Sequence, residues 1–167
     1  MNRLLPNRAS PRPLQQSRRE NTVPLFSTKP IVEKNEQWTC AQPPQAVLDT
    51  LAAAFASHGE DVRRQKTSVE VHLGDNQMYR MMGNLTAEGR ANAPVALTFT
   101  ASESAAGTTL AVHARDTYGF RIGSGKSFGV PETFNRRLEE FLSYAAGVIG
   151  VNRPATGAVP PPPRISS

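Results

Sequence analysis

Apolar and polar residues alternate in several short segments through the middle of the chain, a period of two that is typical of β-strands with one buried face. The clearest segments are residues 36–41, 68–73, 95–100 and 109–115. In the first of them, Trp38 and Cys40 share one face. Residues 78–83 follow a turn signal at residues 74–76, and they are predicted to pair with residues 68–73 as an antiparallel hairpin.

Two other segments repeat apolar residues every third or fourth position, which is the period of a helix with one buried face. Residues 45–58 carry such a stripe, with Pro43 and Pro44 before it as a start signal and Gly59 after it as a stop signal. A second helix is predicted to begin at Pro131. Its apolar stripe consists of Phe134, Leu138, Phe141, Leu142 and Ala145. The opposite side of this helix carries Arg136, Arg137, Glu139 and Glu140.

The predicted order is therefore strand, helix, four strands, helix. Strands with one apolar face build an antiparallel sheet that is covered on that face only, and both helices have an apolar stripe to cover it with. The sequence predicts an α+β fold of two layers, with two helices packed on one face of an antiparallel β-sheet (β-α-β-β-β-β-α).

Proline and charge divide the 167-residue chain into three parts. Ten of the 14 prolines lie before residue 36 or after residue 150. Residues 1–35 hold seven Lys and Arg against two Glu, whereas residues 36–150 hold ten against twelve acidic residues. We therefore expect a disordered basic N-terminal tail (residues 1–35), a single α+β domain (residues 36–150) and a disordered Pro-rich C-terminal tail (residues 151–167).

This charge distribution does not favour a domain with its own nucleic-acid-binding face, because such a domain usually carries a basic patch. The basic tail remains suited to nonspecific contact with nucleic acid or anionic lipid.

No apolar run is long enough to span a bilayer. Cys40 is the single cysteine, so no internal disulfide is possible and a cytoplasmic location is predicted. The acid-free, Arg-rich first 19 residues also resemble an organelle import signal, although their prolines would interrupt its helix.

The stretch GFRIGSGKS (residues 119–127) ends like a phosphate-binding loop. That motif needs glycine six positions before the lysine and a helix that begins at the lysine. Here Phe120 occupies the glycine position, and the helix is predicted to begin only at Pro131. The stretch is better interpreted as a glycine-rich connector, in which Arg121 and Lys126 either contact an anionic partner or are solvated.

No catalytic, cofactor or metal site is predicted. His58 lies near a helix end, and His72 and His113 would meet only if their strands were neighbours. Arg115 and Asp116 interrupt the apolar alternation before Tyr118. They mark either a bulge or strand end, or a ligand cavity that they line with Tyr118. The proline run at residues 160–163 is either a spacer or a ligand for a partner's aromatic groove.

The order of elements and two short motifs resemble the kinase-associated C-terminal domain found at the ends of some protein kinases. Trp38-Thr39-Cys40 is similar to the family's Trp-Ser-Met-like start, and Gly119-Phe120-Arg121-Ile122 is similar to its Gly-hydrophobic-Arg-Phe run. Members of the family bind anionic phospholipid or fold back on a kinase. The resemblance implies that Arg121 and Lys126 are the contact residues, although the connector in this chain is longer and rich in glycine.

The same order also resembles a shortened helix-grip, or START-like, domain, which holds apolar ligands between its sheet and a long C-terminal helix. Two functions therefore stay open. The first is a non-catalytic interaction module that acts through protein partners or an anionic surface. The alternative is a small helix-grip carrier or enzyme that binds an apolar molecule with Arg115, Asp116 or Tyr118 in its cavity. The sequence does not decide whether the protein is an enzyme, and it favours a binding function over a catalytic one.

Overall fold

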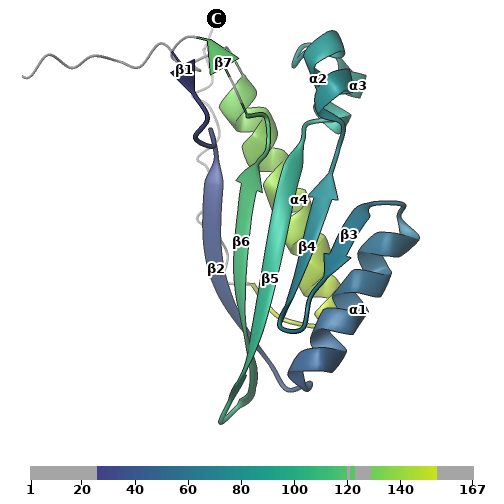
Figure 1. Cartoon of the computed structure of the whole chain (residues 1–167), viewed down its shortest axis with the longest axis vertical. Helices are drawn as coiled ribbons and strands as arrows, with labels where there is room; N and C mark the ends of the chain where they lie inside the picture. Colours follow the sequence, from purple (N-terminus) through teal and green to yellow (C-terminus); the bar gives the residue numbers. More distant parts are fainter. Residues whose placement is uncertain (1–25, 120, 123–128, 154–167) are drawn as a thin grey trace, which may run out of the picture.

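Five strands form an antiparallel sheet in the order β2-β6-β5-β4-β3 (Figure 1). The structure is a computed structural model, and it describes residues 26–119, 121–122 and 129–153. The strands of the sheet are β2 (Glu33–Cys40), β3 (Asp61–Arg64), β4 (Ser68–Leu73), β5 (Val95–Ser104) and β6 (Gly107–Asp116). A separate antiparallel pair joins β1 (Phe26–Ser27) to β7 (Arg121–Ile122).

Two long helices, α1 (Pro44–Ser57) and α4 (Val130–Ile149), pack against the sheet and against each other (Figure 1). Every second residue of β4 and β6 is buried, as the alternation predicts, and Val71 of β4, Leu97 of β5 and Leu110 of β6 are fully inaccessible to solvent. The predicted two-layer α+β fold and its order of strand, helix, four strands, helix are confirmed.

The apolar stripe of α4 divides between two environments. Phe134, Leu138, Leu142 and Ala145 are completely buried in the core. Phe141, from the same predicted stripe, is only partly buried and contacts the edge of the core. Pro44 begins α1 and Pro131 lies in the first turn of α4, as their fixed φ angle favours.

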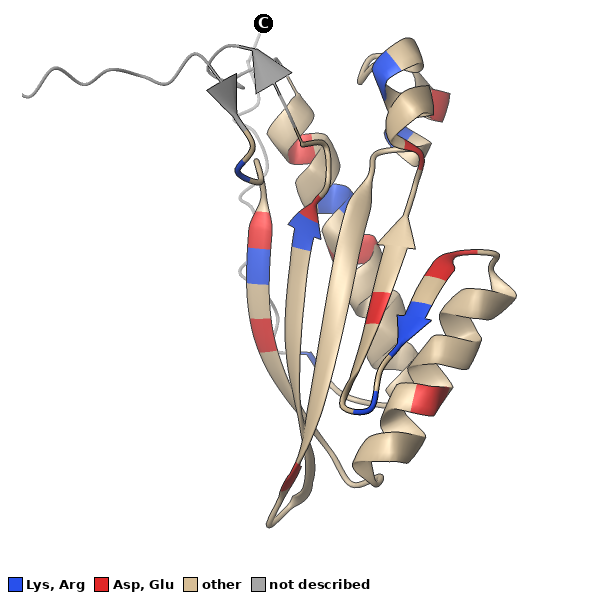
Figure 2. Ribbon diagram, in the orientation of Figure 1, with Lys and Arg blue, Asp and Glu red and all other residues tan. Residues whose placement is uncertain are grey.

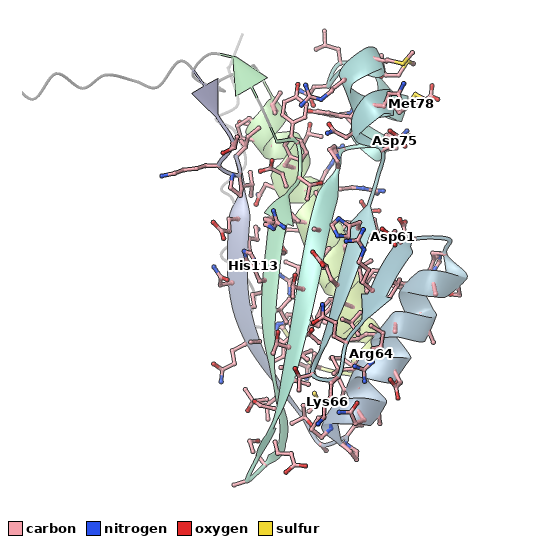
Figure 3. All side chains as sticks on the ribbon, viewed as in Figure 1. Asp61, Arg64, Lys66, Asp75, Met78 and His113 are labelled. Atoms are coloured by element: carbon pink, nitrogen blue, oxygen red, sulfur yellow. The ribbon has the colours of Figure 1, made fainter. Side chains whose placement is uncertain are left out.

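Residues 78–83 do not form the predicted strand, because most of them belong to a helix, α2 (Asn76–Met82). The carboxylate of Asp75 accepts hydrogen bonds from the amides of Gln77 (2.8 Å) and Met78 (3.0 Å), and this cap starts the helix (Figure 3). A short helix, α3 (Ala87–Ala91), follows in the stretch expected to be a loop. Short apolar runs fit both periods, and the cap decides between them here.

The prediction needs four strands of the sheet between the two long helices, and β3 takes the place of the strand expected at residues 78–83. It pairs with β4 at the edge of the sheet. It has only four residues, and Val62 is the one apolar residue among them. The alternation was too short to be recognised in the sequence. The predicted order is therefore correct, but one of its strands lies at residues 61–64 instead of 78–83.

Two glycines permit tight turns beside these strands. Gly107 (φ +117°) begins β6, where a Cβ atom would lie 2.4 Å from the carbonyl oxygen of Cys40. Gly74 (φ +78°) follows β4, where a Cβ atom would lie 2.6 Å from the carbonyl oxygen of Ala93. Both positions exclude any side chain.

None of the helices in the described chain combines the length and the apolar composition needed to cross a bilayer. The sheet begins at Glu33, three residues before the predicted domain start. Residues 1–25 and 154–167, which make up most of the two predicted tails, lie outside the described residues.

Candidate binding groove on the last helix

Two adjoining hollows lie along α4, and we call them together the α4 groove. The aromatic hollow has a volume of about 350 Å³ and is lined by Phe55, His58, Glu60, Arg137, Glu140, Phe141 and Tyr144. The arginine hollow has a volume of about 300 Å³ and is lined by Ala87, Arg90, Ala91, Thr133, Arg136, Arg137 and Glu140. Arg137 and Glu140 line both, so the hollows meet at these two side chains.

Three rings from two helices form the wall of the aromatic hollow. Phe55 of α1 lies 5.3 Å from Tyr144 and 6.4 Å from Phe141, measured between ring centroids. The guanidinium carbon of Arg137 lies 4.3 Å from the centroid of Phe141, a stacked cation–π contact. This wall offers an apolar surface that already holds one planar cation.

Polar groups surround the opening of the aromatic hollow. His58 caps the C-terminal end of α1 and contacts the ring of Tyr144 edge-on, with 5.2 Å between centroids. Burial raises the pKa of Glu60 above its ordinary value, although the positive charges of Arg137 and His58 oppose that rise. Glu60 and Glu140 both line this hollow, so it is unfavourable for a further carboxylate.

The arginine hollow is built from α3 and the first half of α4. Arg90 is positioned by hydrogen bonds from its Nη1 to the carbonyl oxygens of Asn84 (3.2 Å) and Leu85 (2.9 Å). Arg137 donates from Nη1 to Glu140 at 3.1 Å, whereas its buried Nε has no acceptor within the described chain. Arg136 is exposed, and it forms no hydrogen bond or ion pair with any of the residues described.

The electrostatic balance of the arginine hollow is positive, because three guanidinium groups share one lining carboxylate, that of Glu140. Figure 2 shows charged residues on β2, at the end of β6 and on the helices, whereas most of β5 carries none. Planar guanidinium groups bind carboxylate and phosphate oxygens through paired hydrogen bonds. The arginine hollow can therefore bind an anionic group.

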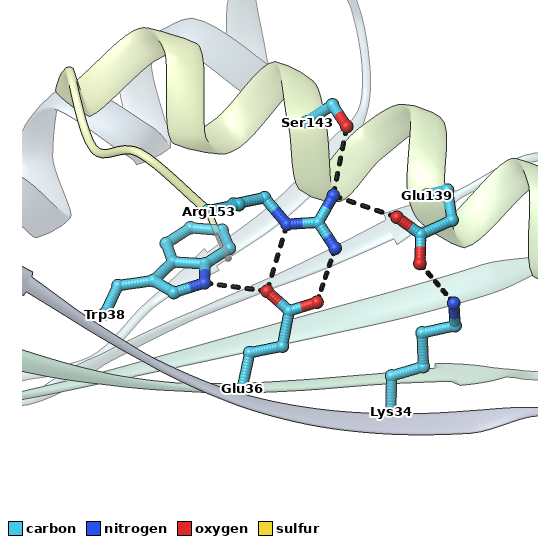
Figure 4. A network of polar contacts seen from close by, with 6 residues as sticks. All are labelled: Lys34, Glu36, Trp38, Glu139, Ser143 and Arg153. Carbon is cyan, nitrogen blue, oxygen red and sulfur yellow. Dashed lines mark hydrogen bonds and ion pairs between the residues drawn. The ribbon is translucent and has the colours of Figure 1, made fainter. Parts of the chain in front are cut away.

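A different arginine that contacts α4 is paired with two carboxylates. Arg153 donates to both oxygens of Glu36, to Glu139 at 2.9 Å and to Ser143 at 3.0 Å (Figure 4). Glu139 also pairs with Lys34. This acid-paired network joins β2, α4 and the chain after α4.

The network shifts the acidity of its members. The hydrogen bonds from Arg153, aided by one from Trp38, lower the pKa of Glu36 against the opposing effect of burial. Burial would raise the pKa of Glu139, but hydrogen bonds from Lys34 and Arg153 outweigh it, and the pKa is lowered. The pKa of Arg153 is raised, chiefly by its hydrogen bond with Glu36.

The residues predicted to line a cavity do not line either hollow. Asp116 is buried, and its Oδ2 accepts hydrogen bonds from the backbone amides of Ile31 and Val32. Its Oδ1 also accepts a bond from the amide of Tyr118 at 3.3 Å. Asp116 therefore has a structural role at the end of β6, as the strand-end interpretation predicts.

Tyr118 and Arg115 line neither the aromatic hollow nor the arginine hollow. The ring of Tyr118 packs edge-on against Tyr79, with 5.4 Å between centroids, and the Arg80 guanidinium lies 4.6 Å from its centre. Arg115 is opposite Glu33 on the face of the sheet that α1 and α4 leave uncovered. The backbone of Arg121 lies in β7, but its side chain, Lys126 and the GSGKS stretch are outside the described residues.

The three histidines do not meet. His72 of β4 and His113 of β6 lie on opposite sides of β5, so their strands are not neighbours. Each faces a different carboxylate, Glu70 at 3.2 Å and Glu33 at 2.6 Å respectively. No group of three metal-ligating side chains is found among the described residues. Cys40 is buried, and burial raises the pKa of its thiol.

Comparisons with known proteins do not place the chain in a family. No protein-family model matches it, and no curated protein matches it. Protein MLL2253 from Mesorhizobium loti is a solved structure similar to 68% of this chain and 98% of its own, with 13% identity and a TM-score of 0.36.

Proposed function

We propose that this protein is a non-catalytic interaction module that binds an anionic partner through the arginine hollow. The observation that carries the proposal is the convergence of Arg90, Arg136 and Arg137 on one hollow with a single lining carboxylate. Arg90 is held by two backbone carbonyls and Arg137 stacks on a ring, so little side-chain entropy is lost when they bind a ligand.

The test uses the full chain and a fluorescein-labelled peptide of ten glutamates, with fluorescence anisotropy measured at low and at physiological salt. Arg136→Ala is expected to weaken binding about fivefold, because one exposed charge pair contributes up to about 1 kcal/mol. Arg63→Ala is the control, since Arg63 is an exposed arginine on β3 that lines neither hollow. Equal affinity of the wild type and Arg136→Ala would contradict the proposal.

An anionic membrane surface remains the second candidate partner, in keeping with the resemblance to kinase-associated C-terminal domains. On that hypothesis the basic residues before position 20, together with Arg121 and Lys126, contact phospholipid or, nonspecifically, nucleic acid. The described residues support the arginine hollow more directly, because its three guanidinium groups are gathered in one place.

The helix-grip carrier is less well supported as an alternative. Such a carrier would hold its ligand between the sheet and α4, where Phe99, Leu110 and Leu138 are completely buried. The two hollows lie instead beside α4, towards α1 and α3. An apolar ligand would therefore enter from the side of the helix rather than from inside the fold.

A further inference from the structure

The two hollows of the α4 groove differ in chemistry but meet at Arg137 and Glu140. One has an aromatic wall and two carboxylates, whereas the other has three guanidinium groups. A ligand that covers both must therefore present an apolar group and an anionic group side by side. In an extended peptide the side chains of residues i and i+2 point to the same side, about 6.6 Å apart, so two such side chains can enter neighbouring hollows.

Carboxylates at the aromatic hollow set the order of these groups. Glu60 and Glu140 repel an acidic side chain there, while the rings of Phe55, Phe141 and Tyr144 favour an apolar one. The arginine hollow has the opposite preference. His58 and Arg137 reduce the repulsion at the aromatic hollow without reversing it, because Arg137 is itself paired with Glu140.

We propose that the partner is an acidic peptide segment that inserts one aromatic or large aliphatic side chain into the aromatic hollow while its carboxylates pair with Arg90 and Arg136. This inference rests on the proposed function, and it names the partner for the same groove. The segment combines an apolar anchor in a pocket with a charged flank, a common division of roles at protein interfaces.

A peptide fits the groove better than a membrane does. The apolar part of the groove is recessed between α1 and α4, and Phe55 at its base is 1% exposed. The large apolar side chains most exposed in the described chain are Met81 (72%) and Leu85 (85%), and neither lines the groove. A membrane-binding surface needs apolar side chains that project into lipid, whereas a recess receives a side chain from its partner.

The experiment compares two labelled seven-residue peptides, each with six glutamates around a central residue that is Phe in one and Ala in the other. With the full wild-type chain, the Phe peptide is expected to bind about tenfold more tightly than the Ala peptide. In Phe141→Ala this preference is expected to fall below about threefold, because the wall of the hollow is lost.

A second measurement does not depend on the folding of the variant. Amide chemical shifts of residues 58–60 and 141–144 of the wild type are expected to change with the Phe peptide and to stay in place with the Ala peptide. Equal affinity of the two peptides, or a Phe preference that survives in folded Phe141→Ala, would overturn the inference.

The outcomes separate this inference from the proposed function. If both peptides bind equally but depend on Arg136, the arginine hollow stands and the apolar anchor is wrong. If neither peptide binds, both proposals are wrong. Phosphatidylserine vesicles that bind through Arg136 while the peptides do not would overturn the peptide inference in favour of a lipid surface.

Discussion

Arg153 contacts α4, and the arginines of the α4 groove lie along the same helix, yet their charges are balanced differently. Arg153 is 11% exposed and meets the carboxylates of Glu36 and Glu139. Arg136 is exposed and forms no ion pair with the residues described, and it shares a hollow with Arg90 and Arg137 that has one lining carboxylate. A neutralised guanidinium holds elements together, whereas a surplus of guanidinium groups is available to a partner.

The largest expected effect is on stability, and it comes from removing Arg153, the arginine that is paired with two carboxylates. Arg153→Met leaves the partly buried Glu36 without its main donor and leaves Glu139 with Lys34 alone. We expect the free energy of unfolding to fall by about 2 kcal/mol, because hydrogen bonds between charged groups contribute that much. Urea denaturation followed by circular dichroism measures the change.

Arg136→Met is the matched control for that variant. Its unfolding free energy is expected to stay within about 0.5 kcal/mol of the wild type, as for most surface substitutions. A loss of stability in Arg136→Met as large as in Arg153→Met would show that the two arginines do not differ in the way proposed here.

The pH dependence of stability sharpens the comparison, because acids in the two regions shift in opposite directions. The pKa of Glu36 is lowered in the folded protein, so its stabilising effect is complete well above its ordinary pKa of 4.5 and is lost as the pH falls through the lowered value. Glu36→Gln is therefore expected to be destabilising at pH 7 and to approach the wild type in acid.

Glu60 in the groove is expected to show the reverse. Its pKa is raised in the folded protein, so its stability contribution is fully present below the ordinary pKa and is lost as the pH rises through the raised value. Glu60→Gln is expected to be more stable than the wild type at pH 7 and equal to it in acid. Denaturation series at several pH values test both variants, and parallel trends would contradict the assignment.

The smallest effect is expected on peptide affinity, when the net positive charge of the arginine hollow is increased by removing a carboxylate. Glu140→Gln removes the one carboxylate of the arginine hollow and frees Arg137. Affinity for the ten-glutamate peptide is expected to rise about twofold, in line with the small energies of exposed ion pairs. Glu103→Gln, on the exposed end of β5, is the control. Unchanged affinity in Glu140→Gln would mean that Glu140 does not compete with the ligand.

The fold was largely predictable because it depends on periodicity, which is local in sequence. Alternation identified β4, β5 and β6. The predicted apolar stripe of α4 is buried in the core except for Phe141, which is partly buried and lines the groove. The error at α2 arose because a single carboxylate, that of Asp75, selected a helix in a short apolar run. The hairpin strand β3 was too brief and too polar to show an alternation.

The candidate site was much less predictable, since its residues come from separate elements. Arg136 and Arg137 were recognised only as the polar side of a helix, and Arg90 carried no signal that α3 would bring it to them. Asp116 gave a real signal as an ionisable residue in an apolar context, and three backbone amides donate hydrogen bonds to its carboxylate. Periodicity shows which face of an element is buried, but not which polar residues meet.

The contacts of Asp116 with Ile31 and Val32 also set the smallest piece of this protein that keeps its interior intact. A fragment trimmed to the apolar pattern, starting at Glu36 and stopping at Gly150, would remove two of the three amide partners of the buried Asp116 and the cation that pairs with Glu36. Autonomous folding is thus expected to need two backbone amides and one arginine that lie just outside residues 36–150.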